Sequence, residues 1–342
     1  MATEPLIIRI MREFKAGLLW HERTNLREML RRWLQVEASL QAQIDLLAEE
    51  VARGWAAGQV TTATQLYRME RYQALIVQVR REVQQYQDWL AGRLTTWQQG
   101  NLALGIEQGA AVIEAAGIHV VFNHLPVSAV EYMAGFCADG APLFDLLRGR
   151  AIAPEAVDGL TRVLVDAVAQ GWNPRKTARR MADGLAQGLE KARVIARTEQ
   201  LRAYRAALAE QYRASGVVGG MRRLAAKDGR TCLACLARDG EVIPLGREID
   251  DHPQGRCSAV PQLIGAPPLE WQTGAQWFKT LSAEEQRAMM GDKMYELWGR
   301  GKGFDFSALA RTTHSDTWGD GLRVATYEEM AQAAAAAARK AA

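Results

Sequence analysis

The chain has 342 residues, of which 48% are hydrophobic and 24% charged, and it carries only four cysteines. These fractions are ordinary for globular proteins and exclude a wholly disordered chain, while four cysteines are too few for a disulfide framework. No apolar run approaches the ~18–20 residues of a membrane helix, and Glu4 precedes the first apolar run. We therefore expect a soluble protein of a reducing cytoplasm, with no membrane partner. At about 100–200 residues per domain, the length allows two or three domains.

Apolar residues recur every seven positions in two stretches of the first hundred residues. The first series is Leu26, Trp33, Leu40 and Leu47, with Leu30, Ile44 and Val51 at the offset position. The second series is Met69, Ile76, Val83, Leu90 and Trp97, with Tyr72, Val79 and Tyr86 at the offset. Glu37 is the one defect in the first series, and Gly54 and Gly58 separate the two. Two apolar positions per seven are typical of helices that pack along a narrow seam. The sequence therefore predicts a long antiparallel helical hairpin, with Thr61 or Thr62 as the cap of its second helix.

Two interpretations of the seam remain open at this point. It belongs to the intramolecular core, or it also docks on partner subunits and allows self-association, because two helices alone leave much apolar surface uncovered.

From residue 118 onward the heptad pattern stops and the residue pattern is more varied. The run IHVVF at 118–122 is β-branched and aromatic, and helical segments follow it. Asn173 and Pro174 open a further long helix, and a turn-rich stretch extends from Gly216 to about Gly265. After it, the patterns Ser282–Glu285 and Thr326–Glu329 have the spacing of capping boxes.

These features predict a mainly α protein with a small α+β module. The expected regions are a helical hairpin at 1–117, a helical middle domain at 118–215, a Cys/His module at 216–264 and a helical C-terminal region at 265–342.

Charge is spread unevenly, although the net charge is only +3. Residues 171–230 contain fourteen Lys or Arg against five acids, a net +9, and the remainder carries −6. Such a segment is typical of contact with a polyanion such as double-stranded DNA, of contact with an acidic protein surface, or of a solvated helix face. Base reading is disfavoured because no helix-turn-helix or zinc-finger spacing is present. The candidates for DNA contact are Arg175, Lys176, Arg179, Arg180, Lys191, Arg193, Arg202 and Arg205.

Three of the four cysteines fall in one short stretch with a histidine between them. Cys232, Cys235, His252 and Cys257 have the spacing C-x2-C-x16-H-x4-C. Three thiolates and an imidazole suit Zn²⁺, and four protein ligands favour a closed structural site over a catalytic one. A packed cluster without metal and a redox pair are the alternatives. Cys137 lies far from the cluster in sequence, and we expect it to be a small buried side chain.

Three ordered motifs resemble the Mu F-like family of phage minor head, or head-morphogenesis, proteins. The first is A-R-T-E at 196–199, the second is D-x-R-T-C-x-x-C at 228–235, and the third is H-P-Q-G-R-C at 252–257. The family usually ends in Cys-Arg-Cys, whereas this chain has Gly255 at the first of these cysteines. We expect a structural role for the motif residues Arg197, Thr198, Glu199, Asp228, Arg230 and Thr231, and a working site at the A-R-T-E residues is the alternative.

The resemblance also implies partners and a location. It indicates a low-copy component of the head of a tailed phage or prophage, made in the bacterial cytoplasm, that associates with portal and capsid or scaffold proteins during procapsid assembly. Contact with packaged DNA is part of the same expectation.

Enzyme templates fail at particular residues. His21 and Glu22 begin an HExxH pattern, but Asn25 replaces its second histidine. The glycines around Lys302 lack the Walker spacing, and no G-x-S-x-G is present. We therefore expect a protein that is not an enzyme. The alternatives are a nucleic-acid-binding packaging or ejection factor and, less favoured, a zinc-dependent enzyme or toxin.

Overall fold

The computed structural model describes residues 4–118, 122–137, 140–149, 152–247, 249, 251–299, 304–315 and 318–340. These residues form a mainly helical protein with two small antiparallel sheets, which confirms the predicted fold class. The chain divides into two compact units. Unit 1 contains Met1–Leu19, Gln99–Ala134 and Leu201–Ala342, and unit 2 contains Trp20–Gln98 and Gly135–Gln200. The four consecutive regions expected from sequence texture remain a prediction.

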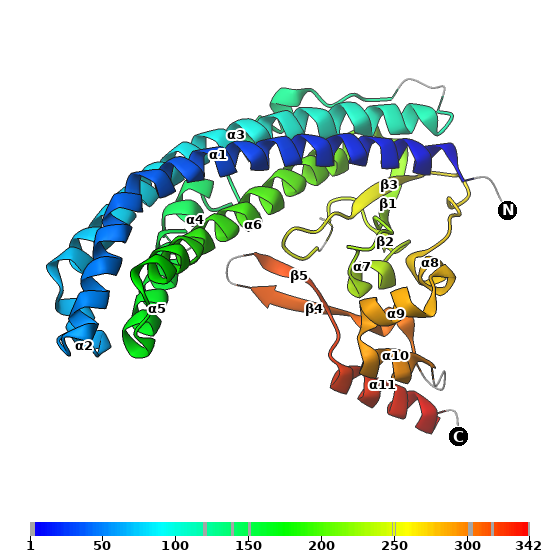
Figure 1. Ribbon diagram of the computed structural model, residues 1–342. Coiled ribbons are helices and arrows are strands. Elements are labelled where there is room, and N and C mark those ends of the chain that lie inside the picture. Colours follow the sequence, from blue (N-terminus) through cyan, green and yellow to red (C-terminus); the bar gives the residue numbers. More distant parts are fainter. Residues whose placement is uncertain are drawn as a thin grey trace. The chain divides into compact units, whose positions relative to one another are not determined.

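Figure 1 shows three long helices, α1 (Leu6–Ala56), α3 (Glu70–Ala115) and α6 (Pro174–Ser215). Each of them contributes residues to both units. A short helix, α2 (Ala63–Arg68), lies between α1 and α3, and Thr62 caps it in a capping box with Gln65. The backbone leaves the helical region at Met69, where ψ is 125°. The hairpin is therefore confirmed, but its second long helix begins at Glu70.

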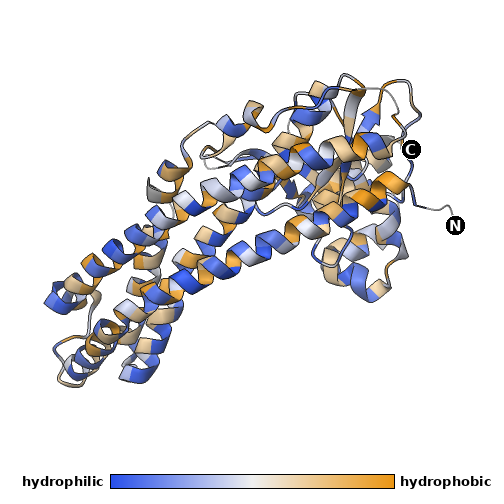
Figure 2. Ribbon diagram, turned by 90° about the horizontal axis from the view of Figure 1, so that it is seen from above, coloured by the Kyte–Doolittle hydropathy of each residue, from blue (hydrophilic) through white to orange (hydrophobic). Residues whose placement is uncertain are grey.

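The first heptad series is buried in unit 2 only in part. Trp33, Leu40, Ile44, Leu47 and Val51 are all at most 1% exposed. Leu30, at an offset position of the series, is 45% exposed. Met29 and Val36, each one residue before an offset position, are buried instead. A straight helix repeats every 3.6 residues rather than every 3.5, so a seam read strictly in sevens drifts off the buried face. Figure 2 shows the resulting alternation of hydrophobic and hydrophilic residues along the long helices.

Within unit 2, α1 and α3 are antiparallel and two further helices pack on them. Trp33 and Tyr86 meet edge to face with their ring centroids 4.9 Å apart, and Arg93 pairs with Glu28 at 2.9 Å. The covering helices are α4 (Leu143–Gly149) and α5 (Ile152–Gln170), and the Tyr72 hydroxyl of α3 lies 3.1 Å from the Thr161 hydroxyl of α5. The buried seam is therefore core of this unit, as the first interpretation predicts.

In unit 1, the ends of the long helices pack against a three-stranded sheet. The strands are β1 (Val218–Leu224), β2 (Val242–Ile243) and β3 (Ser258–Leu263), in the antiparallel order β2-β1-β3. The core contains Met11, Val112, Tyr212, Met221 and Val260. Two 3-10 turns, η1 (Val127–Ala129) and η2 (Glu131–Met133), precede the sheet in the chain. Three residues of the β-branched and aromatic run at 118–122 lie outside the described residues.

The C-terminal part of unit 1 is mostly short helices. They are α7 (Leu233–Ala237), α8 (Gly274–Thr280), α9 (Ala283–Met290), α10 (Asp292–Gly299), η3 (Phe306–Leu309) and α11 (Tyr327–Lys340). Both predicted capping boxes are confirmed, at Ser282 with Glu285 and at Thr326 with Glu329.

The sequence did not predict the hairpin of β4 (Ala310–Ser315) and β5 (Gly319–Val324) in this part of the chain. The segment around Lys302 lies outside the described residues. In the part of the chain that is described, no helix combines the length and the hydropathy that a membrane span needs.

Candidate metal centre

Local structure brings the two close cysteines to one point. Cys232 is the N-cap of α7, where its Sγ accepts a hydrogen bond from the Cys235 backbone N at 3.4 Å. Cys257 directly precedes β3, and His252 lies on the loop that leads to it. The cap position of Cys232 therefore places its thiol next to Cys235 across the first turn of α7. Cys257, directly before the edge strand β3, contributes the third thiol.

The four ligands predicted from the sequence gather around Cys235. His252 Nε2 lies 3.3 Å from Cys232 Sγ and 3.4 Å from Cys235 Sγ. Cys235 and Cys257 form a second group with Asp251, whose ligand atoms all lie within 4.8 Å of one another. A cavity of about 50 Å³ is lined by Cys232, Cys235, His252 and Cys257. That space holds one ion and no bulky substrate.

The thiols are electrostatically coupled. The Cys235 thiol donates a hydrogen bond to Cys232, which lowers the pKa of Cys232 to about 4, and His252 lowers it further. Contact with the Cys232 and Cys257 sulfurs, together with burial, raises the pKa of Cys235. Contact with the Cys232 sulfur raises the pKa of His252 to about 9. His252 Nδ1 lies 2.8 Å from the Pro253 carbonyl oxygen, which can only accept, so Nε2 is the nitrogen that faces the sulfurs.

Cations from three elements surround this cluster. Arg205 of α6 donates from Nη1 to Asp251 Oδ2 at 3.0 Å and to the Gly255 carbonyl at 3.0 Å. Arg223 of β1 is 2% exposed and hydrogen-bonds the Cys257 thiol. Lys15 of α1 has a buried Nζ with no hydrogen-bond partner among the described residues, and its electrostatic neighbours include Cys257 and Asp251. Burial lowers the pKa of Lys15. Buried cations at this density require anionic neighbours, which the thiols and Asp251 can provide.

The D-x-R-T motif forms a tight loop before the first cysteine. Arg256 makes a bidentate ion pair with Asp228, at 2.6 and 2.8 Å, and this pair holds the pKa of the Asp228 carboxyl well below its usual range. Asp228 Oδ1 also accepts from the Thr231 hydroxyl at 2.9 Å and from the Arg230 backbone N at 3.0 Å. These contacts link the loop before Cys232 to the segment before Cys257.

The A-R-T-E residues act within unit 2. Arg197 pairs with Glu22 of α1, whose side chain is 4% exposed. The Thr198 hydroxyl donates to the Val194 carbonyl oxygen, in its own helix turn, at 2.7 Å. Glu199 is 1% exposed and accepts from Gln98 of α3 at 3.5 Å. The motif therefore joins α6 to both other long helices. Glu22 of the failed HExxH pattern is part of this packing.

The candidates for DNA contact divide by position on α6. Arg175, Lys176, Arg179 and Arg180 are exposed on the first two turns. Lys191, Arg193 and Arg202 are half-buried, and Arg193 pairs with Glu190 at 2.5 Å. Arg205 is turned into the metal centre, with 11% of its side chain exposed. The exposed cations thus gather where α6 begins, after the cap that Asn173 makes on the Lys176 backbone N at 2.9 Å.

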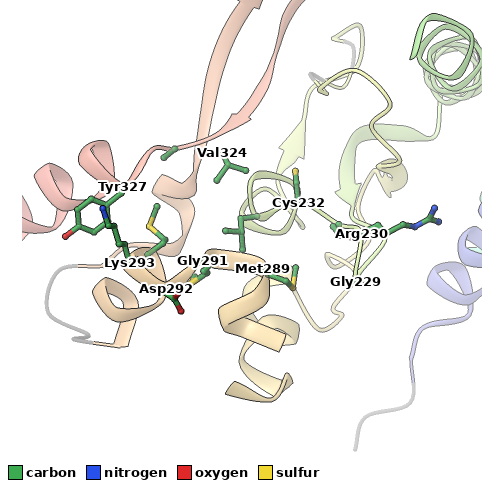
Figure 3. Close-up of a pocket in the computed structure, with 14 residues that line it drawn as sticks. Gly229, Arg230, Cys232, Met289, Gly291, Asp292, Lys293, Val324 and Tyr327 are labelled. Carbon is green, nitrogen blue, oxygen red and sulfur yellow. The ribbon is translucent and has the colours of Figure 1, made fainter. Parts of the chain in front are cut away.

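A larger cleft of about 730 Å³ lies beside the cluster in unit 1. Figure 3 shows Cys232 and Arg230 on one side of it and Lys293 and Tyr327 on the other. Its other lining residues are mainly apolar, and its acid, Asp292, pairs with Arg287 at 2.8 Å.

The sequence did not predict two residues of the candidate metal centre, Asp251 and Lys15. Asp251 adjoins His252, so its position next to a candidate ligand was an available signal. Lys15 lies more than 200 positions from the cysteines, and no local pattern links it to them.

The fold and the site define a mainly helical protein with a compact Cys/His module suited to one divalent ion. Residues 158–271, a third of the chain, match the family described as phage Mu protein F like protein, which confirms the resemblance. The match covers α6 and the whole cluster, and it supports a phage head-related structural protein. No curated protein and no solved structure matches this chain significantly.

Proposed function

We propose that this chain is a structural minor head protein of a tailed phage or prophage. It acts in procapsid assembly, where it associates with the portal and with capsid or scaffold proteins and becomes part of the virion. The observation that carries the proposal is the family match at 158–271, because it spans both the A-R-T-E helix and the Cys/His module.

The proposed role of the Cys/His module is structural zinc binding. Three sulfurs and one imidazole nitrogen around a cavity of about 50 Å³ fit a single Zn²⁺. When bound, zinc supplies folding free energy to a module whose sheet has only three short strands. His252 presents Nε2, Cys232 and Cys235 close the α7 turn, and Cys257 anchors β3. We propose no reaction, since four protein donors leave no open position.

Co-purification tests the assembly role. The tagged chain is produced in cells that make the portal, scaffold and capsid proteins of the same phage, and procapsids and mature heads are then separated by density. We expect the chain in both fractions and bound to isolated portal. A chain missing from all three would overturn the proposal.

Elemental analysis tests the zinc role. Protein purified under reducing conditions should hold about one zinc per chain, and both Cys232→Ser and His252→Ala should lose it. Cys137→Ser is the matched control, because Cys137 is a buried cysteine outside the cluster and its loss should leave the zinc content unchanged. Reduced wild-type protein without metal would reject the zinc role.

The exposed cations of α6 favour a second candidate role, in DNA contact during packaging or ejection. Arg175, Lys176, Arg179 and Arg180 occupy two turns at a helix N-terminus, where the helix dipole adds to their positive potential. This role requires affinity for double-stranded DNA that falls steeply with salt and does not depend on base sequence. Absent or salt-independent binding would reject it.

A further inference from the structure

The Asp251 carboxylate is a donor that neither the C-x2-C spacing nor the histidine identified. We propose that Asp251 is itself a ligand of the metal held by Cys232, Cys235, His252 and Cys257. The inference rests on the proposed zinc role and changes its ligand set.

Distances support a direct contact between Asp251 and the metal. Asp251 Oδ1 lies 3.7 Å from Cys235 Sγ and 3.8 Å from His252 Nε2. With bonds of ~2.3 Å to sulfur and ~2.0 Å to nitrogen or oxygen, neighbouring donors of one zinc ion lie roughly 3–4 Å apart, and Asp251 would add a fifth donor to the four predicted ones. The pairs that His252 Nε2 makes with Cys232 and Cys235, at 3.3 and 3.4 Å, have the same spacing.

The carboxylate is fixed in this position rather than free to swing into solvent. Its side chain is 2% exposed, Oδ2 accepts from Arg205 at 3.0 Å, and Oδ1 accepts from the His252 backbone N at 2.9 Å. An oriented carboxylate of this kind needs little reorganisation to bind an ion.

Gly255 makes the space that Asp251 occupies. A Cβ atom on Gly255 would collide with the Asp251 carboxyl group, and the contact would involve Cγ and both oxygens. Any side chain at 255 would therefore displace the carboxylate from Cys235. The glycine and the aspartate form one arrangement, in which the absence of a side chain at 255 admits an oxygen donor from 251.

The charges around the cluster are compatible with this ligand set. Three thiolates and one carboxylate carry four negative charges, so a divalent ion leaves an excess of two. Lys15, Arg205 and Arg223 face this group, and the buried Nζ of Lys15 has no hydrogen-bond partner in the described chain. Buried cations of this kind require anionic neighbours, and an anionic metal centre provides them.

Cobalt substitution of the full-length reduced protein tests the inference. Charge-transfer absorption reports thiolate ligands, and the visible d–d bands report coordination geometry and the light-atom donors. We expect Asp251→Asn to shift the d–d bands and to keep the thiolate absorption. Gly255→Ala should reproduce this change although it retains the carboxylate. Gly229→Ala is the matched control, because a Cβ there meets nothing within 4 Å.

Zinc X-ray absorption provides a second readout. Asp251→Asn and Gly255→Ala should each remove one oxygen or nitrogen scatterer from the first shell, whereas Gly229→Ala should remove none. If both site variants keep the wild-type spectrum and scatterer count, Asp251 only positions His252, and the inference is overturned. If the wild type binds neither cobalt nor zinc, the proposed zinc role fails as well, so the two failures are distinguishable.

Discussion

Gly159 and Gly184 bring α5 and α6 into direct backbone contact. A Cβ atom on Gly184 would lie 2.6 Å from the Gly159 carbonyl oxygen, and one on Gly159 would collide with the carbonyl oxygen of Gly184. Real Cβ atoms do not approach a backbone oxygen this closely, so only glycine fits at either position. This contact holds the helix that carries the A-R-T-E motif against α5 in unit 2.

We expect Gly159→Ala to destabilise the protein by about 2 kcal/mol or more, because the new methyl group must push two helix backbones apart. Thermal unfolding followed by circular dichroism measures the change. Gly92→Ala in α3 is the matched control, since a Cβ there meets nothing within 4 Å, and it should stabilise by about 0.5–1 kcal/mol. Equal effects of the two substitutions would contradict the close helix contact.

The buried pair of Lys227 and Asp239 predicts that removing Asp239 costs more stability than removing Lys227. Lys227 Nζ lies 2.9 Å from Asp239 Oδ2, and their side chains are 3% and 0% exposed. Asp239 also accepts from the Ala225 backbone N at 2.7 Å and from Trp271 Nε1 at 3.2 Å. Asp239→Ala should cost about 3–5 kcal/mol, because it leaves the buried Lys227 ammonium with only the Gln272 carbonyl oxygen as an acceptor and strands two further donors.

Lys227→Met should cost less than Asp239→Ala, because Asp239 keeps both of its other donors. Chemical unfolding of the two single variants and the double variant measures the coupling. A Lys227→Met variant as unstable as Asp239→Ala would show that the ion pair, rather than the set of donors to Asp239, dominates.

The ion pair of Asp228 with Arg256 predicts a particular pH dependence. Hydrogen bonds from Arg256 hold the folded-state pKa of Asp228 well below its usual range, so the pair stabilises the fold at pH values above the unfolded pKa of about 4. This contribution is lost as the pH falls below 4 towards the folded pKa. Asp228→Asn should therefore be less stable than wild type at pH 7, and the difference should shrink in acid. Thermal unfolding from pH 7 to pH 2 measures it, and a constant difference would contradict the pair.

Features set by short stretches of sequence were predictable. The caps at Thr62, Ser282 and Thr326 and the approach of Cys232 to Cys235 depend on residues within three positions of each other. Local geometry determines such contacts before any tertiary packing, so their spacing is sufficient.

Features set by packing were not predictable. Leu30 is apolar at a heptad position, yet Met29 and Val36 take its place because the packed helix follows the 3.6-residue repeat. After Ala310, the first strand of the β4–β5 hairpin alternates half-buried and exposed polar residues, a weak signal beside the helical segments around it. Lys15 reaches the cluster only because α1 packs on the sheet of unit 1.

Lys15→Met should raise the stability of the chelator-treated protein and lower the affinity of the protein for zinc. Removing a buried ammonium that lacks a hydrogen-bond partner among the described residues relieves a desolvation cost, so the chelated protein should gain stability. The same change removes a positive charge beside the thiolates and should weaken zinc binding roughly tenfold. Competition with a chromophoric chelator measures the affinity. Arg9→Met, which removes an exposed cation of the same helix, should change neither quantity.

Charge reversal at the start of α6 separates DNA contact from a merely solvated face. If the four exposed cations there contact phosphates, the logarithm of the DNA affinity should fall with the logarithm of salt concentration with a slope of about −3.6. Arg179→Glu with Arg180→Glu should weaken binding and reduce the size of this slope by about 2, as measured by fluorescence anisotropy with duplexes of unrelated sequence. Arg80→Glu with Arg81→Glu makes the same charge change at exposed positions of α3 and should leave the slope nearly unchanged. An equal effect of both pairs would mean that net charge alone attracts DNA, and the start of α6 would then have no particular role.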